Sequence, residues 1–226
     1  MTAHFAFGGH DFHIVDKTAL FWPKRRALIF ADLHLEKASW FAARGQMLPP
    51  YDSQATLERI AALVGTTSAT EVWCLGDNFH DDAGPTRLSG AATALLAKLT
   101  GETDWHWITG NHDEHLPDGI GGSIHIEVET EGLILRHQAG LLELRPELSG
   151  HFHPKVRARA RGQSVSRPCF ILGERKLIFP AFGAFAGGMD ASEAAAIAQV
   201  GCGAKAVLSS SERLVTLSLV SKRREA

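Results

Sequence analysis

The stretch ALIFADLH, residues 27–34, joins five apolar residues to an aspartate and a histidine. An apolar run of this length predicts a buried strand, and Asp32 and His34 follow at its C-terminal end. In extended backbone, residues two apart project to the same side, so both side chains can grip one ion. The stretch therefore predicts a central strand that delivers metal ligands.

The same arrangement recurs further along the chain, in VWCLGD (72–77), WHWITGNHD (105–113), LILRH (133–137) and GHFH (150–153). These motifs supply carboxylate, amide and imidazole groups, from Asp77, Asn111, His137, His151 and His153. A single histidine would more often be a core or surface residue. Ordered motifs at strand ends instead indicate a metal centre assembled from the whole domain, an arrangement typical of enzymes.

The mixture of imidazole and carboxylate groups, without a thiolate, suits Mn, Fe or Zn better than Ca or Mg. Two such ions about 3.5–4 Å apart form a clamp for in-line attack on phosphorus by a bridging hydroxide. Asp77 can bridge two cations because a carboxylate has two oxygens, and the preceding Gly76 allows a sharp exit from its strand. The motifs thus predict a dinuclear centre that hydrolyses phosphate esters.

The order of strands and helices in the first half predicts a parallel sheet with helical crossovers. We expect a hairpin turning at Asp16-Lys17, strands at 27–31, 72–75 and 105–108, and helices from Glu36, from an N-cap at Asp52 or Ser53, and over 88–99. Later strands are expected at 123–127, 133–137, 141–144, 169–172, 176–179, 206–208 and 214–220, with a helix from Asp190 to Val200 whose capping box uses Glu193. This order predicts one domain, residues 1–226, with two packed sheets flanked by helices.

The composition bounds the class of protein. The 226-residue chain is 45% hydrophobic, enough for one large core, and its net charge of −2 excludes a uniformly basic nucleic-acid-binding domain. No apolar run reaches the roughly 18 residues that cross a bilayer, and the N-terminus lacks a secretory pattern. Three cysteines without a close pair argue against a disulfide framework. We therefore expect a cytoplasmic protein.

A basic run follows the last motif and comprises Lys155, Arg157, Arg159, Arg161 and Arg167. On an extended segment the three middle arginines project from one face, which suits contact with a nucleic-acid backbone. A solvated edge strand, protected by its charges against unwanted pairing, explains the same pattern. The position of the run, two residues after His153, favours the first interpretation.

The motif series from residue 32 to residue 153 resembles the calcineurin-like metallophosphoesterases. The resemblance implies a four-layer αββα sandwich with a dinuclear centre at the strand C-termini. It implies that the first ion is held by Asp32, His34, Asp77 and His153. It also implies that the second ion is held by the bridging Asp77 together with Asn111, His137 and His151.

Within the GNHD motif, the resemblance implies that His112 contacts the scissile phosphate and assists the leaving group, and that Asp113 orients His112. His125 and His115 are rivals of His137 for the second ion. We prefer His137 because an apolar run delivers it.

A narrower resemblance concerns DNA-processing members of the family, in which a histidine placed like His80 contacts the substrate phosphate. The stretches ADLHLEK (31–37), PCF (168–170) and PAFGAFAGG (180–188) look like the bacterial ligase-associated DNA-damage-response phosphoesterases, the PdeM group. This implies a Mn-dependent phosphodiesterase and DNA endonuclease that acts on single strands in DNA repair. It further implies a functional association with an Lhr-type helicase, an ATP-dependent DNA ligase and an exonuclease-like protein.

Two other functions compete with this interpretation. The same chemistry can serve small nucleotide diesters or phosphomonoesters, because the chain has no separate DNA-clamping domain. A non-enzymatic scaffold is disfavoured because the ligand series is complete.

The glycine-rich segment 180–188 also has two interpretations. Phe182 and Phe185 either pack under a sheet in a tight loop or stack on splayed bases. Trp40 and Phe41 raise the same choice, and for them a helical core face is favoured.

Overall fold

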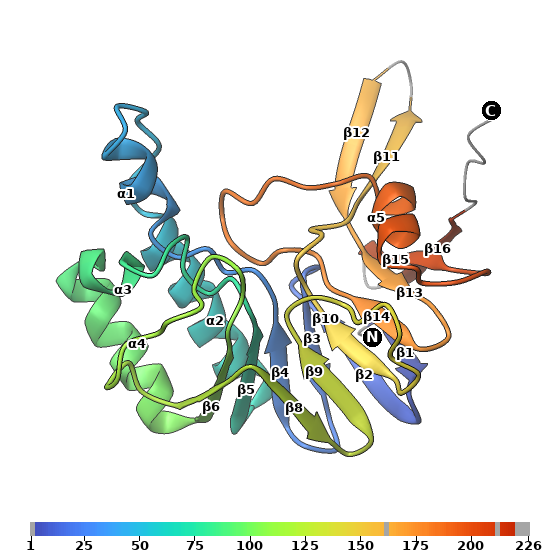
Figure 1. Ribbon diagram of the computed structural model, residues 1–226, viewed down its shortest axis with the longest axis horizontal. Helices are drawn as coiled ribbons and strands as arrows, with labels where there is room; N and C mark the ends of the chain where they lie inside the picture. Colours follow the sequence, from blue (N-terminus) through green and yellow to red (C-terminus); the bar gives the residue numbers. More distant parts are fainter. Residues whose placement is uncertain (1–2, 161–162, 211–212, 220–226) are drawn as a thin grey trace.

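The computed structural model describes residues 3–160, 163–210 and 213–219, which form two seven-stranded sheets, a two-stranded hairpin and five helices (Figure 1). The first sheet has the order β1 (His4–Phe7), β2 (His10–Val15), β3 (Ala19–Trp22), β4 (Ala27–Phe30), β5 (Glu71–Leu75), β6 (Asp104–Ile108) and β7 (Ser123–His125). Strands β1 to β4 pair antiparallel, and β4 to β7 pair parallel. Four helices connect the parallel strands: α1 (Lys37–Ala42), α2 (Asp52–Thr67), α3 (Gly84–Arg87) and α4 (Gly90–Glu102).

The second sheet has the order β16 (Arg213–Ser218), β15 (Lys205–Ser210), β13 (Phe170–Leu172), β14 (Lys176–Ile178), β10 (Glu147–Ser149), β9 (Leu133–Arg136) and β8 (Glu127–Thr130). In it, β9, β10 and β14 pair parallel and the other neighbours antiparallel. Helix α5 (Ala191–Ile197) packs on this sheet. The separate hairpin of β11 (Lys155–Ala160) and β12 (Gln163–Pro168) projects from the body (Figure 1).

Alternate residues of each central strand face different cores. Ile29 of β4 and Leu177 of β14 belong to the apolar cluster between the two sheets. Leu28, the neighbour of Ile29, belongs instead to the cluster beneath the helices, with Leu57 of α2. Ile178, the neighbour of Leu177 in β14, likewise belongs to the cluster beneath α5. Helices, sheet, sheet and helix therefore form successive layers, which confirms the predicted αββα sandwich.

Parallel pairing brings the ends of the central strands together. Because β4 and β5 run parallel, the loops that follow them leave the sheet side by side. Backbone hydrogen bonds join these loops, from Asp32 N to Gly76 O at 3.1 Å and from His34 N to Asp77 O at 2.9 Å. The first two motifs are thus fixed to one another by main-chain atoms.

Several local predictions differ from the structure. Neither Asp52 nor Ser53 caps α2, whose N-cap is Tyr51 without a side-chain hydrogen bond. Asp52 instead accepts from Ala38 N at 2.9 Å, and Ser53 binds both the carboxylate and the amide of Glu36, each at 2.7 Å. These polar residues stabilise the start of α1 rather than their own helix.

The β-rich half contains three further differences. The single strand predicted over 123–127 is two strands in different sheets, separated at the exposed Ile126. The strand predicted over 141–144 is wrong: this segment is a loop with exposed leucines, and the strand that follows is β10. In α5, Asp190 accepts from Ser192 N rather than through a capping box with Glu193, and the helix ends at Ile197.

No helix in the described part of the chain is both long and apolar enough to span a membrane.

Removing side-chain volume between the sheets should destabilise the folded protein. Leu177 is 0% exposed, so we expect Leu177→Ala to lower the free energy of unfolding by about 2–5 kcal/mol. Leu142 is 92% exposed, so we expect Leu142→Ala to change the free energy of unfolding by only about 0.5 kcal/mol. Urea unfolding followed by tryptophan fluorescence measures both variants, and equal losses would contradict the assignment of residues 141–144 to a solvated loop.

Candidate metal centre

The backbone of the motif residues is strained rather than extended. Asp32 and His34 have φ angles of 54° and 44°, and Asp77, His151 and His153 have 49°, 72° and 46°. Non-glycine residues adopt positive φ at a cost, which native structures tolerate mainly where function requires it. The prediction that strand alternation aims Asp32 and His34 together is therefore wrong, because left-handed turns aim them.

A first cluster contains Asp32, His34, Asp77 and His153, whose nearest ligand atoms all lie within 4.8 Å of one another. His34 Nε2 lies 3.2 Å from His153 Nε2, which in turn lies 3.3 Å from Asp32 Oδ1. Asp32 is completely buried, and His34 is 5% exposed. These are the residues that the family resemblance assigns to the first ion.

A second cluster contains Asp77, His137 and His151. The side-chain oxygen of Asn111 lies 3.1 Å from His137 Nε2 and 3.0 Å from His151 Nδ1. The two histidines approach one another to 3.1 Å, between Nε2 of His137 and Nδ1 of His151. The structure thus brings together the four residues that the family resemblance assigns to the second ion.

Asp77 belongs to both clusters, and its two oxygens face different ones. Oδ1 lies 3.3 Å from His137 Nε2, and Oδ2 lies 3.9 Å from His34 Nε2. The backbone amide of His112 donates to Oδ1 at 3.0 Å, which fixes the carboxylate. A carboxylate held in this way can bridge two cations.

The donor atoms fit divalent metal ions. Donors bound to one ion at roughly 2.1 Å lie roughly 3.0–3.4 Å apart in octahedral or tetrahedral geometry. The closest separations in both clusters, 3.0–3.3 Å, agree, whereas Asp77 Oδ2 and His34 Nε2 lie farther apart, at 3.9 Å. Burial, and then the neighbouring His153, lower the pKa of His34 to about 2. Burial also lowers the pKa of His151. Burial therefore favours the neutral form of both imidazoles, which is the form that binds metal.

Two motif glycines leave space for these ligands. Gly76 has a φ of 79°, and a Cβ added there would collide with the His137 ring. A Cβ on Gly110 would collide with the carboxylate of Asp77. Glycine is therefore required by the close approach of ligands from other segments of the chain.

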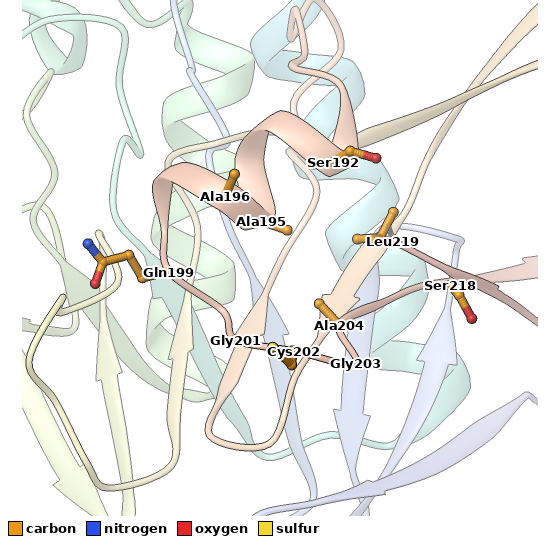
Figure 2. Close-up of a pocket in the computed structure, with 10 residues that line it drawn as sticks. All are labelled: Ser192, Ala195, Ala196, Gln199, Gly201, Cys202, Gly203, Ala204, Ser218 and Leu219. Atoms are coloured by element: carbon orange, nitrogen blue, oxygen red, sulfur yellow. The ribbon is translucent and has the colours of Figure 1, made fainter. Parts of the chain in front are cut away.

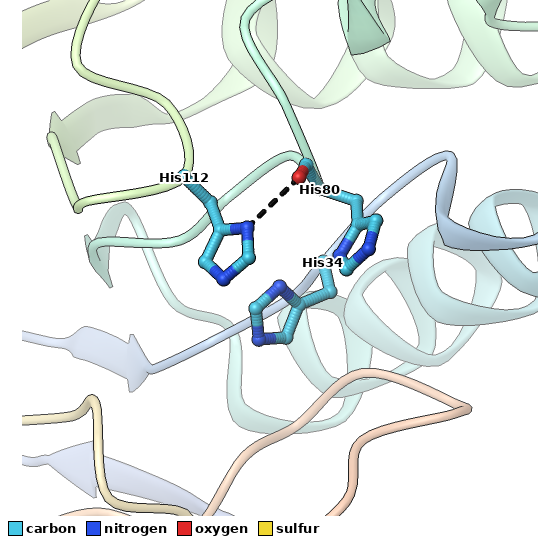
Figure 3. Close-up of side chains that lie close together, drawn as sticks. All are labelled: His34, His80 and His112. Carbon is cyan, nitrogen blue, oxygen red and sulfur yellow. Dashed lines mark hydrogen bonds between the residues drawn. The ribbon is translucent and has the colours of Figure 1, made fainter. Parts of the chain in front are cut away.

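His112 and His80 lie beside the first cluster, next to His34 (Figure 3). His112 Nδ1 donates to the carbonyl oxygen of His80 at 2.9 Å, and the two rings stack 5.0 Å apart. Since a carbonyl only accepts, the Nδ1 of His112 carries a proton and its Nε2 is left for another partner.

Helix α1 packs against His80 and shields it. The rings of Trp40 and Phe41 lie 4.8 and 5.9 Å from the His80 ring. Burial, and then the charge of Lys37, lower the pKa of His80 to about 4. Its Nδ1 makes no hydrogen bond to any described residue. The sequence motifs predict no role for Lys37, which lies three residues after His34.

Asp113 contacts main-chain amides instead of His112. Its carboxylate accepts from Asn78 N at 2.7 Å, from Gly110 N at 2.8 Å and from Phe79 N at 3.1 Å. Burial raises the pKa of Asp113 to about 6, although these amides act to lower it. Asp113 therefore joins the loops after β5 and β6, and the orienting contact expected for it is made by His80 O.

The other candidate residues lie apart from the clusters. His115 is exposed and pairs with Asp82, and His125 lies 3.3 Å from His106, so neither adjoins Asn111 as His137 does. A further group of possible ligands, Glu71, Asp104 and His106, lies toward the N-terminal ends of β5 and β6, away from the clusters. There Arg25 forms an ion pair with Glu71.

The basic run and the glycine-rich segment are placed only in part. Arg157 and Arg167 are exposed on the β11–β12 hairpin. The side chain of Arg159 and the whole of Arg161 lie outside the described residues. Phe182 is buried and packs 4.7 Å from Phe30, as the tight-loop interpretation predicts, whereas Phe185 is only half-buried.

A cavity of about 570 Å³ lies between α5 and the segment 199–204, away from the clusters (Figure 2). The described residues that line it include no carboxylate or imidazole: Ser192, Ala195, Ala196, Gln199, Gly201, Cys202, Gly203, Ala204, Ser218 and Leu219. This cavity therefore offers no alternative metal site.

Comparison with known proteins relates the chain to the calcineurin-like phosphoesterases. The sequence profile of the calcineurin-like phosphoesterases matches residues 25–156, which include both clusters. Nuclease MPE of Pseudomonas putida is 27% identical, with a TM-score of 0.70 over 92% of this chain and 96% of that one. Yfce, a phosphoesterase from E. coli, is 18% identical, with a TM-score of 0.39 over 88% and 96%. No curated protein matches the sequence.

The shared carboxylate should control occupancy of both ion sites. We expect Asp77→Ala to lose both metal ions, because it removes a ligand from each cluster. His151→Ala removes a ligand from the second cluster alone and should lose one ion. Metal content per chain after desalting, with circular dichroism to verify folding, distinguishes these outcomes. Full occupancy in Asp77→Ala would contradict the bridging geometry.

Proposed function

The chain belongs to the calcineurin-like phosphoesterase family, and on that premise we propose that it is a two-metal phosphodiesterase that cuts DNA internally, preferably in single strands. The observation that carries the proposal is the shared carboxylate of Asp77, with one oxygen toward each cluster. The likeness to nuclease MPE across 92% of the chain supports a nucleic acid as the substrate.

We assign the residues of the first cluster to one ion and those of the second, with Asn111, to the other. When bound, the ions would offset charge on the phosphate oxygens and lower the pKa of an attacking water. Manganese fits the mixed imidazole and carboxylate set, as iron and zinc also do. The protein contributes rigid ligand positions, since Asp32 and His34 are fixed by main-chain hydrogen bonds from neighbouring loops.

We assign His112 to the scissile phosphate. Its Nδ1 donates to His80 O, so in the protonated ring Nε2 can donate to a phosphate oxygen or to the leaving oxygen. The stacked ring of His80 holds His112 from one side and presents a second imidazole to the same phosphate. Asp113 acts through position alone, by fixing the loop that carries His112.

The projecting elements suit a flexible polymer. Helix α1 and the β11–β12 hairpin extend on either side of the loop that carries residues 180–188 (Figure 1). Arg157 and Arg167 of the hairpin are exposed and can contact backbone phosphates. We further propose a role in DNA repair beside a helicase that supplies single strands, a DNA ligase and an exonuclease-like protein, on the sequence resemblance alone.

A circular single-stranded DNA tests the central proposal, because a circle has no ends. In Mn²⁺ we expect the wild type to convert the circle to linear product. His112→Ala should keep its metal and lose turnover by about 10²–10⁴-fold, because general acid catalysis is removed. An intact circle beside rapid hydrolysis of a small phosphodiester would move the substrate to a small nucleotide or a strand end.

The exposed hairpin should contribute affinity for DNA. Arg157→Glu should weaken binding of a single strand and lower the slope of log affinity against log salt by about 1, as expected when a phosphate contact is lost. Arg213→Glu makes the same charge change on exposed strand β16 and serves as the matched control. Fluorescence anisotropy at several salt concentrations measures both, and identical slopes would exclude β11 from the DNA path.

A further inference from the structure

A recess of about 220 Å³ adjoins the metal centre on the side of His153. Its walls come mainly from the base of the β11–β12 hairpin and from the glycine-rich segment, with Arg59 of α2, and they include Pro154, Lys155, Pro168 and Pro180. His153 is shared between this recess and the first cluster. A polymer held at the cluster therefore meets the recess as it passes His153.

The glycine-rich segment is held against the first metal motif. Phe182 N donates to Ala31 O at 2.9 Å, and Gly183 N donates to Asp32 O at 3.2 Å. A Cβ on Gly183 would collide with the carbonyl oxygen of Leu33. The wall of the recess is therefore fixed to the same loop that carries the ligands Asp32 and His34.

The side chain of Lys155 is closely packed against this wall. Its side chain crosses Gly188, where a Cβ would lie 2.6 Å from both Cδ and Cε of the lysine. The ammonium donates to Ala186 O at 3.2 Å. A side chain placed so closely is ordered by packing before any ligand arrives, which lowers the entropic cost of binding.

The charge of Lys155 is uncompensated. Among the described residues no carboxylate pairs with it. Arg59, the other cation in the wall, is ion-paired with Asp16 at 2.7 Å and donates to Phe182 O at 2.9 Å. Lys155 is therefore the cation of the recess that is available to an anion.

We infer that the recess binds the nucleotide next to the scissile phosphate, with its phosphate on Lys155 and its unpaired base against the proline-lined wall. This inference rests on the proposed function. The small volume admits one base with its sugar and excludes a base pair, so the recess selects single strands. The metal clusters hydrolyse the ester, and the recess positions the neighbouring unit.

Binding and turnover test the subsite separately. Anisotropy of a labelled single-stranded oligonucleotide is measured in Mn²⁺ on the His112→Ala protein, which prevents cleavage. Adding Lys155→Ala should weaken binding about tenfold, as for loss of a charged hydrogen bond, whereas Lys155→Arg should restore most of it. Lys98→Ala, an exposed lysine on α4, makes the same charge change and should leave affinity unchanged.

A second variant adds bulk at the edge of the recess without removing charge. Gly187 lines the recess and has nothing within 4 Å of an added Cβ, so Gly187→Trp can fold. It should also weaken single-strand binding. With His112 intact, both variants should lose at least about tenfold more activity on DNA than on bis(4-nitrophenyl) phosphate.

Three results would overturn the subsite: equal affinity of Lys155→Ala and Lys98→Ala, no effect of Gly187→Trp, or parallel losses on DNA and on the small diester. Failure of the proposed function has a different signature. In that case the wild type leaves the single-stranded circle intact, whatever the variants do to binding.

Discussion

The carboxylate of Asp77 is the point on which the site depends. One oxygen faces His34 and the other faces His137, and these histidines follow strands of different sheets. For both contacts to exist, the loops after β4, β5, β6 and β9 must leave the sandwich at a common place. Parallel pairing within each sheet and apolar packing between the sheets provide that geometry. The motif glycines follow from the same constraint, because a Cβ at Gly110 would occupy the position of the carboxylate.

Much of this arrangement could be predicted from the sequence, because apolar runs and ligand residues alternate along it. The buried strands at 27–30, 71–75 and 104–108 and the sandwich itself follow from those runs. The loop at 141–144 was not predictable in this way, since its leucines have the composition of a strand but lie in solvent. The division of 123–127 between two sheets also has no local signal, because it depends on which sheet offers a free edge.

Within the site, the residue types and their grouping into two clusters were predictable, whereas several individual contacts were not. The sequence left His137, His125 and His115 as rivals, and only the fold shows that His137 adjoins Asn111. The contacts of Asp113 with three amides, and those of Lys155 with the segment 186–188, join residues that are distant in sequence. Such contacts are set by loop conformation, and the left-handed backbone at Asp32 and His34 shows that strand alternation does not determine it.

The first cluster draws its ligands from both halves of the sandwich. His34 and His153 are 119 residues apart, and their nitrogens lie 3.2 Å from each other. An ion bound there would act as a cross-link that closes a long loop and connects the two sheets. Ion binding also offsets the conformational energy stored in the left-handed ligand residues, which the folded chain must otherwise bear alone. Metal binding at this cluster would therefore be thermodynamically coupled to folding, so removal of the metal should lower the free energy of unfolding.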